Sequence, residues 1–140
     1  MTVEISETRD IAACLALRRT VFIEEQGVSE ADEIDELDDA ALHLLAMHNG
    51  KPIGCARILI TDTTAKIGRV CVLKSDRGTG LGAELIRACL QVCANQSGVT
   101  RATLGAQTHA LGFYEKLGFT AYGPIFDDAG IDHQAMEIAV

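Results

Sequence analysis

Three glycines at alternate positions, Gly78, Gly80 and Gly82, constrain the fold of this 140-residue chain more than any other feature. They lie in the stretch SDRGTGLGAEL (75–85), between an apolar, strand-like segment and the start of a helix-like run. Each glycine weakens a helix by roughly 0.5–1 kcal/mol relative to alanine. Three glycines at the start of a helix therefore indicate a role other than helix formation. A strand that enters a helix through glycines is typical of α/β proteins that bind an anion at the helix N-terminus, where N–H groups are free.

The hydrophobic pattern predicts the order of the remaining elements. A strand at 2–6 precedes a helix at 8–26 with Thr8 as its N-cap. Two apolar runs, 42–48 and 52–60, flank the Asn49-Gly50 pair, which indicates a β-hairpin. Further segments are expected as strands at 65–73, 100–106, 120–123 and 132–140, as helices at 82–98, ended by Gly98, and at 109–119, and as a loop at 124–131. We therefore expect one α/β domain over residues 1–140, with a mixed central sheet of about six or seven strands and about four helices.

Composition excludes several classes of protein. The net charge of −8 argues against nucleic acid as a partner, and no apolar run approaches the roughly 20 residues of a membrane span. The N-terminus carries no basic and apolar signal pattern, which predicts a cytoplasmic protein. Five cysteines without a C-x-x-C motif predict neither a disulfide framework nor a metal site. Cys89 and Cys93 have the spacing of metal ligands on a helix, but packing as small hydrophobic residues is the favoured interpretation.

The segment 29–40 is strongly acidic, with seven Asp or Glu among its twelve residues. It lacks the central glycine and ligand spacing of an EF-hand. Two interpretations remain open: a solvated loop, which is favoured, or a charged surface that attracts a cationic substrate.

The glycine stretch matches neither of two common phosphate-binding motifs, because no Lys follows it and its spacing is not G-x-G-x-x-G. Arg77, Gly80 and Gly82 instead fit the pattern Arg/Gln-x-x-Gly-x-Gly/Ala. This pattern resembles the acetyl-CoA pyrophosphate loop of the GNAT superfamily of N-acetyltransferases. GFYEKLGF (112–119) is similar to the late helix of that superfamily, and LRRTVFIEEQGV, CARIL and IFDDAGIDHQAM resemble its ElaA-like branch. The C-terminal part is also similar to glyphosate N-acetyltransferase-type enzymes.

The resemblance implies that acetyl-CoA is the co-substrate and that a small-molecule amine is the acceptor. Backbone N–H groups of the loop would hold the pyrophosphate, and Gln107 the pantetheine arm. A backbone N–H in Val70, Cys71 and Val72 would polarise the thioester carbonyl. The residues of the glycine loop that would contact acetyl-CoA are Arg77, Gly78, Thr79, Gly80, Leu81, Gly82 and Ala83. Cys71 could instead act as a nucleophile, although its apolar strand favours a core position.

The resemblance places Tyr114 as the general acid for the leaving thiolate and His133 as the general base for the amine. Glu25 is the second candidate for the base, and His109 could face the site or only cap the helix. Phe113 is expected to fill the core and to leave Tyr114 free. Two arginines, Arg57 and Arg69, either bind an anionic acceptor or pair with the acidic segment, and ion pairing is favoured.

Two other function classes remain: a non-catalytic acetyl-CoA sensor or interaction domain, and a hydrolase, for which no G-x-S-x-G motif exists. Folds of this kind are compatible with a homodimer. The acceptor's charge stays open, because the acidic segment suggests a cation and the glyphosate-type resemblance suggests an anion.

Overall fold

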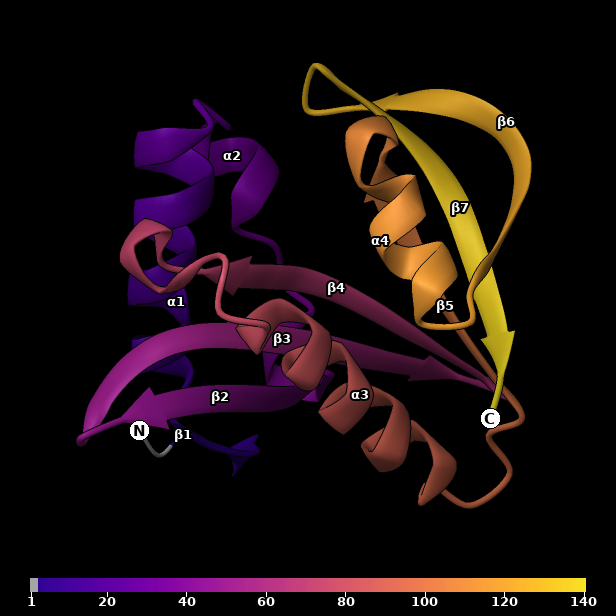
Figure 1. Cartoon of the computed structure of the whole chain (residues 1–140), viewed down its shortest axis with the longest axis horizontal. Coiled ribbons are helices and arrows are strands. Elements are labelled where there is room, and N and C mark those ends of the chain that lie inside the picture. Colours follow the sequence, from indigo (N-terminus) through magenta and orange to yellow (C-terminus); the bar gives the residue numbers. More distant parts are fainter. Residues whose placement is uncertain (1–2) are drawn as a thin grey trace.

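The computed structural model describes residues 3–140 and contains one mixed sheet of seven strands, in the spatial order β1-β2-β3-β4-β5-β7-β6 (Figure 1). The strands are β1 (Val3–Thr8), β2 (Leu42–His48), β3 (Lys51–Thr61), β4 (Thr64–Val72), β5 (Arg101–Gln107), β6 (Thr120–Asp128) and β7 (Ile131–Ala139). The α-helices are α1 (Ile11–Arg18), α2 (Glu30–Glu33), α3 (Leu81–Ala94) and α4 (Leu111–Lys116). This α/β architecture and its element order confirm the prediction.

The sheet is covered on both faces. Neighbouring residues of a strand point to opposite sides of the sheet, and they pack here into two different cores. On β2, Leu44 packs in the larger core with Leu85 and Ile86 of α3. The next residue, Leu45, packs in a second core with Cys14 and other residues of α1. Helices α1 and α3 therefore lie on opposite faces, with the sheet between them (Figure 1). No helix within residues 3–140 is long and apolar enough to cross a membrane.

The β2–β3 hairpin confirms the signal of its turn residues. Asn49 and Gly50 have φ values of 52° and 76°, the left-handed conformation that a tight two-residue turn requires. The last pair before the turn is His48 with Lys51.

The helix boundaries at the N-terminal end of the chain differ from the prediction. Thr8 is not the N-cap, because it remains in β1 and pairs with His43. Asp10 caps α1 instead, and its Oδ1 accepts a hydrogen bond of 3.1 Å from the N–H of Ala13. The α-helix continues directly into a π-helix, Arg19–Glu25. The single helix that was predicted is therefore an α-helix followed by a π-helix.

The prediction that Gly98 ends α3 is also wrong. The helix ends at Ala94, with Asn95 as its C-cap. Gly98 follows later with a φ of 81°, in the turn that leads to Val99. Glycine marks the turn of the connection here and not the last turn of the helix.

The predicted loop at 124–131 is wrong. Strand β6 continues to Asp128, and the chain reverses in a tight turn at Ala129 and Gly130, with φ values of 54° and 82°. Pro124 and Gly123 interrupt the pattern of a strand in the sequence. An edge strand tolerates them because proline needs no ladder partner there, and the register of β6 shifts between Tyr122 and Phe126.

The sheet opens between its two central strands. Strand β4 pairs in parallel with β5 only from Thr64 to Lys66, opposite Arg101–Thr103. Strand β5 then continues beside β7 as far as the pair Gln107–His133. Beyond Lys66 the strands β4 and β5 diverge, and Figure 1 shows the resulting V-shaped gap in the sheet.

Candidate active site

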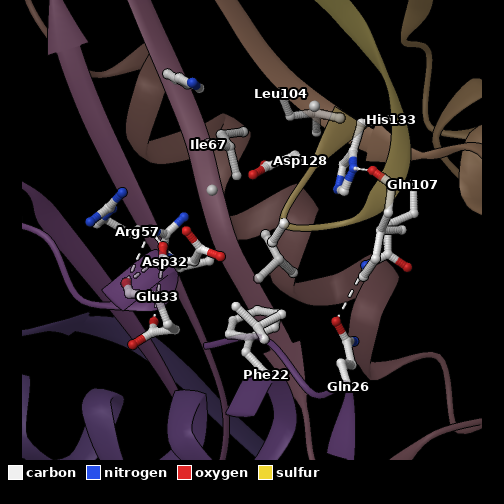
Figure 2. Close-up of a pocket in the computed structure, with 18 of the residues that line it drawn as sticks. Phe22, Gln26, Asp32, Glu33, Arg57, Ile67, Leu104, Gln107, Asp128 and His133 are labelled. Carbon is white, nitrogen blue, oxygen red and sulfur yellow. Dashed lines mark hydrogen bonds and ion pairs between the residues drawn. The ribbon is translucent and has the colours of Figure 1, made fainter. Parts of the chain in front are cut away.

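A cavity of about 470 Å³ lies in the opening between β4 and β5. One side consists of Lys66, Ile67, Gly68, Arg69 and Val70 from β4, and the other of Leu104, Gly105 and Gln107 from β5. Figure 2 shows His133 and Gln107 on one side of the cavity, with Arg57 and Glu33 on the other. The divergence of two strands thus exposes backbone and side chains in the middle of the sheet.

Strand β4 carries a β-bulge beside this cavity. Cys71 pairs with Cys55 of β3, but the next pair joins Gly68 to Arg57, so β4 has one residue more than β3 between them. Arg69 lies in this bulge, and its φ of 51° is rare for a residue with a side chain. A bulge leaves a residue out of the regular ladder and turns the backbone locally. The bulge therefore lies next to the segment 70–72, where the polarising N–H is expected.

The glycine loop forms the approach to the N-terminus of α3. Gly78 and Gly80 have φ values of 78° and 86°, and Gly80 is the N-cap. Its cap position has no side-chain hydrogen bond. Within residues 3–140, the backbone N–H groups of residues 78–83 make no hydrogen bond outside the helix. The positive end of the helix dipole and free donors therefore meet at this loop, as an anion site requires.

The loop residues 77–83 do not line the cavity between β4 and β5. Of the residues predicted to contact acetyl-CoA, Val70, Gln107 and Tyr114 line it. Cys71 and Val72 belong to the same strand but are not part of the lining. Cys71 is buried in the core with α1, and its Sγ lies 3.4 Å from that of Cys55.

Arg77 and Glu25, two predicted site residues, are paired with each other. The Nη1 and Nη2 of Arg77 donate to the carboxylate of Glu25 at 2.5 and 2.9 Å. The Nε of Arg77 also donates to the carbonyl of Val72 at 3.0 Å. The hydrogen bond from Arg77 lowers the pKa of Glu25, which makes this carboxylate a weaker base. Glu25 is not part of the cavity lining.

Tyr114 lines the cavity from α4 and packs edge-on against Phe119, with ring centroids 5.8 Å apart. Burial, together with the nearby Cys89, raises the pKa of its phenol, so the group keeps its proton at neutral pH. The expectation that Phe113 fills the core is wrong, since Phe113 is 41% exposed and Tyr114 packs against the larger core. The short helix turns its tyrosine inward and its phenylalanine outward.

His133 lies in β7, opposite Phe126 of β6, and the two rings stack with centroids 5.9 Å apart. The Nδ1 of His133 lies 2.7 Å from the carbonyl oxygen of Ile131. A carbonyl only accepts, so Nδ1 carries the proton of the neutral ring and Nε2 keeps a lone pair. His133 lines the cavity and therefore offers a basic nitrogen at the side of the opening opposite β4.

Gln107 connects the end of β5 to two neighbours. Its Nε2 donates to the Oε1 of Gln26 at 3.3 Å, and its Oε1 lies 2.7 Å from the Nε2 of His109. His109 itself is exposed and outside the cavity lining, so it orients Gln107 and does not face the cavity.

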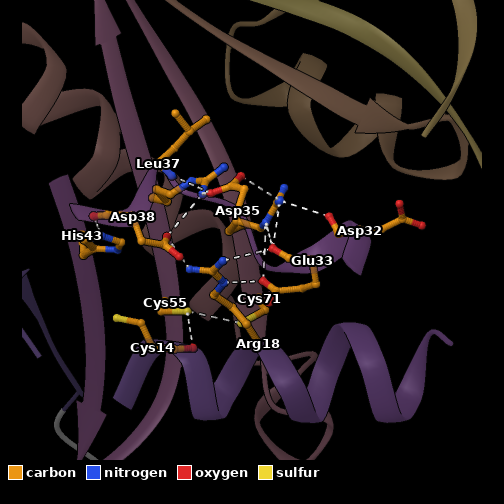
Figure 3. A network of polar contacts seen from close by, with 12 residues as sticks. Cys14, Arg18, Asp32, Glu33, Asp35, Leu37, Asp38, His43, Cys55 and Cys71 are labelled. Atoms are coloured by element: carbon orange, nitrogen blue, oxygen red, sulfur yellow. Dashed lines mark hydrogen bonds and ion pairs between the residues drawn. The ribbon is translucent and has the colours of Figure 1, made fainter. Parts of the chain in front are cut away.

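The acidic segment forms a buried ion network beside the cavity, which Figure 3 shows. Arg18, only 1% exposed, donates to Glu33 at 2.5 Å and to Asp38 at 2.8 Å. Arg57 donates to Asp35 at 2.7 Å and to Asp38 at 3.2 Å. The favoured solvated loop is therefore wrong for these carboxylates.

Arg69 joins the same network through Glu33 and Asp35, at 3.5 and 3.3 Å. The ion pairs of Arg57 and Arg69 confirm the favoured interpretation of these two residues. Burial raises the pKa of Asp38, but Arg18 and Arg57 outweigh this effect and hold it below its usual value.

Sequence reasoning missed Arg18, and it missed several residues of the cavity. Arg18 follows Cys14 by one helical turn and therefore lies on the buried face of α1, a signal that was available. The missed lining residues include Phe22, Gln26, Val28, Leu37, Phe126 and Asp128. Phe126 and Asp128 were assigned to a loop, which hid their common face on a strand.

Comparison with known proteins agrees with this geometry. The sequence profile described as "Acetyltransferase (GNAT) domain" matches residues 15–140. Protein YyaT of Bacillus subtilis is 42% identical over 94% of this chain and 90% of its own length. ElaA of Escherichia coli is 34% identical over 89% of this chain and 84% of its own. The chain belongs to the GNAT family of acetyltransferases.

Solved structures agree with the fold. The crystal structure of E. coli ElaA superimposes with a TM-score of 0.86 and 30% identity, and covers 97% of this chain and 99% of that one. An acyl-CoA N-acyltransferase from Pseudomonas aeruginosa gives a TM-score of 0.88 at 28% identity, again with 97% and 99% covered. The ElaA structure, together with the ElaA sequence, supports the ElaA-like branch.

Proposed function

We propose that the protein transfers an acetyl group from acetyl-CoA to the primary amine of a small molecule by direct attack. The observation that carries this proposal is the cavity between the diverging strands β4 and β5, into which both Tyr114 and His133 face. A phenol and an imidazole with a free nitrogen are the acid and the base that such a transfer needs. The name of the Pseudomonas aeruginosa neighbour, an acyl-CoA N-acyltransferase, supports an acyl-CoA donor.

In this proposal the N–H groups of the glycine loop bind the pyrophosphate of the donor. The thioester then lies along the opening, with a backbone N–H at the bulge of β4 directed to its carbonyl oxygen. The unpaired helix N-terminus behind Gly80 supplies positive potential for the phosphates. Arg77 contributes by keeping the loop attached to Val72 and Glu25.

The reaction forms one bond and breaks one. The amine nitrogen attacks the thioester carbonyl carbon and loses a proton to the Nε2 of His133. The new N–C bond forms as the C–S bond breaks, and the phenol of Tyr114 protonates the leaving thiolate. The raised pKa of Tyr114 fits this role, because the phenol must hold its proton until the thiolate appears.

The test combines calorimetry with an assay of CoA thiol release from acetyl-CoA in the presence of amines. We expect binding of acetyl-CoA and amine-dependent release of the thiol. Gly80→Val should weaken acetyl-CoA binding strongly, because the side chain disfavours the left-handed backbone and blocks access to the N–H groups. Gly98→Val is the matched control, since Gly98 has a similar φ of 81° but lies in the connection beyond the other end of α3.

Absence of acetyl-CoA binding in the unchanged protein would refute the proposal. Binding without thiol release, for any amine, would instead support a sensor. Equal affinities of the Gly80 and Gly98 variants for acetyl-CoA would remove the glycine loop from its role.

A further inference from the structure

One edge of the Arg57 guanidinium has no hydrogen-bond partner. Arg57 lies in β3, is 5% exposed and lines the cavity. Its Nη1 is held by Asp35 and Asp38. Its Nε is buried without a partner among residues 3–140, and no hydrogen bond found in that range uses its Nη2. The N–H of Nε and one N–H of Nη2 point in the same direction and together match the two oxygens of a carboxylate.

Such an edge is unusual in a folded protein. A buried donor without a partner has lost its bound water and gained nothing in return, so native structures rarely contain one. The guanidinium is also held in place, because Asp38 is fixed in turn by Arg18. The edge is therefore pre-organised for an acceptor group that the chain itself does not supply.

The ion network has no carboxylate to spare for this edge. Three arginines, Arg18, Arg57 and Arg69, meet three carboxylates, Glu33, Asp35 and Asp38. Burial, followed by the charges of Arg57 and Arg18, lowers the pKa of Arg69. Repulsion among the guanidinium groups contributes to this lowering, after burial, and a further negative charge beside them would reduce it.

The opposite side of the cavity suits an amine. Asp128 is exposed at the end of β6 and belongs to the lining, and Figure 2 shows its carboxylate directed into the cavity. His133 and Phe126 lie on the same face of the β6–β7 hairpin. A carboxylate at this place attracts an ammonium group. After that group has released one proton to solvent, the free nitrogen of His133 takes the proton that the neutral amine loses as it attacks.

The two sides are well separated. Strands β4 and β5 lie between β3 and β7 in the sheet, so Arg57 and His133 belong to strands at least three spacings apart, or roughly 14 Å. A ligand that reaches both needs several bonds between its carboxylate and its amine.

We propose that the acceptor is an amino carboxylate in which the amine lies several bonds from the carboxylate. The Nε–Nη2 edge of Arg57 holds the carboxylate, and the amine lies between Asp128 and His133. This inference rests on the proposed acetyl transfer for its chemistry, but binding of the carboxylate to Arg57 is measurable without any transfer.

The test compares amino acids with the amines that lack only the carboxylate. The pairs are glycine and methylamine, β-alanine and ethylamine, 4-aminobutyrate and propylamine, and 6-aminohexanoate and pentylamine. For the two longer pairs, we expect kcat/KM to be roughly 10²- to 10⁴-fold higher for the amino acid, as two hydrogen bonds to a charged group would give. The shortest pair should show little difference, because glycine cannot reach both sides.

Arg57→Lys keeps a positive charge for Asp35 and Asp38 but removes the pair of parallel N–H donors at Nε and Nη2. It should bring the ratio within each longer pair close to one, while acetyl-CoA binding persists. Lys66→Gln is the control, since it removes a positive charge from the same lining and leaves the edge intact. The Lys66 variant should keep the ratio.

The ¹⁵N and ¹H resonances of the Arg57 Nε–H give a second measurement that does not depend on turnover. They should shift when 6-aminohexanoate is added to the complex with CoA, and not when pentylamine is added. Equal rates within all pairs would overturn this inference and leave the acetyl transfer standing. A shift without transfer would support the carboxylate site and refute the transfer, and neither shift nor transfer would refute both.

Discussion

Arg18 provides the sharpest test of what stabilises the fold. The side chain is buried and holds two carboxylates, Glu33 and Asp38, which are themselves 3% and 8% exposed. Arg18→Met preserves much of the volume but leaves both charges without their main partner. Removing one member of a buried ion network costs about 3–5 kcal/mol, a large part of the 5–15 kcal/mol that typically stabilises a domain.

The measurement is urea unfolding followed by circular dichroism, supported by thermal unfolding. For a chain of this length the expected loss lowers the melting temperature by about 10–15 °C. Arg19→Met is the matched control, because Arg19 is the next residue and pairs with Glu30 at the surface, where both side chains are at least half exposed. An exposed pair contributes about 0–1 kcal/mol, so this variant should unfold almost like the unchanged protein. A loss below 1 kcal/mol in Arg18→Met, equal to that of the control, would refute the reasoning.

The pH dependence of the same variant adds an independent check. The pKa of Asp38 is below its usual value in the folded protein, because Arg18 and Arg57 outweigh the effect of burial. A lowered pKa stabilises the fold above the pKa of the unfolded chain, and this stabilisation disappears as the pH falls through the folded pKa. The difference in unfolding free energy between the unchanged protein and Arg18→Met should therefore shrink below about pH 4. A difference that stays constant down to pH 2 would contradict the electrostatic origin.

Three further predictions concern the site and the core. Tyr114→Phe should lower kcat by roughly 10²-fold with little change in acetyl-CoA affinity, whereas Tyr122→Phe, on the exposed edge strand, should leave kcat unchanged; equal rates for the two variants would remove Tyr114 as the acid. His133→Asn should lower kcat/KM by roughly 10²-fold with little change in acetyl-CoA affinity, and an unchanged kcat/KM would point to another base. Burial raises the pKa of Cys89 to about 12 and that of Cys93 to about 11, so a disulfide reagent at pH 8 should label these thiols only after unfolding, and rapid labelling of the native protein would contradict their burial.

Local signals in the sequence predicted the parts of the fold that depend on backbone conformation. Asn49-Gly50 predicted its hairpin because few residue pairs adopt positive φ values together. The glycines around Gly80 predicted the strand-to-helix connection for the same reason. Such features depend on neighbours in the chain and need no knowledge of the tertiary contacts.

The parts that were wrong or missed depend on partners far apart in the sequence. Phe113 and Tyr114 are adjacent aromatic residues on a short helix, and only the packing of α4 against β5 and β6 decides which one turns inward. The acidic segment looks solvated until Arg18 and Arg57, which lie on α1 and β3, are placed beside it. The pairing of β6 with β7 brings Phe126 to His133, and no local pattern indicated that contact.

The short parallel ladder between β4 and β5 has a mechanical consequence. Within residues 3–140, the ladder between the strands β1 to β4 and the strands β5, β7 and β6 has three residue pairs, from Thr64 to Lys66, and one more backbone hydrogen bond joins the N–H of Thr100 to the carbonyl of Thr63. The rest of the connection between these two halves consists of side chains, chiefly those of α3 and the core beneath it. The width of the opening, and with it the size of molecule that fits there, is therefore set mainly by side-chain packing in this shared core and not by the strand ladder.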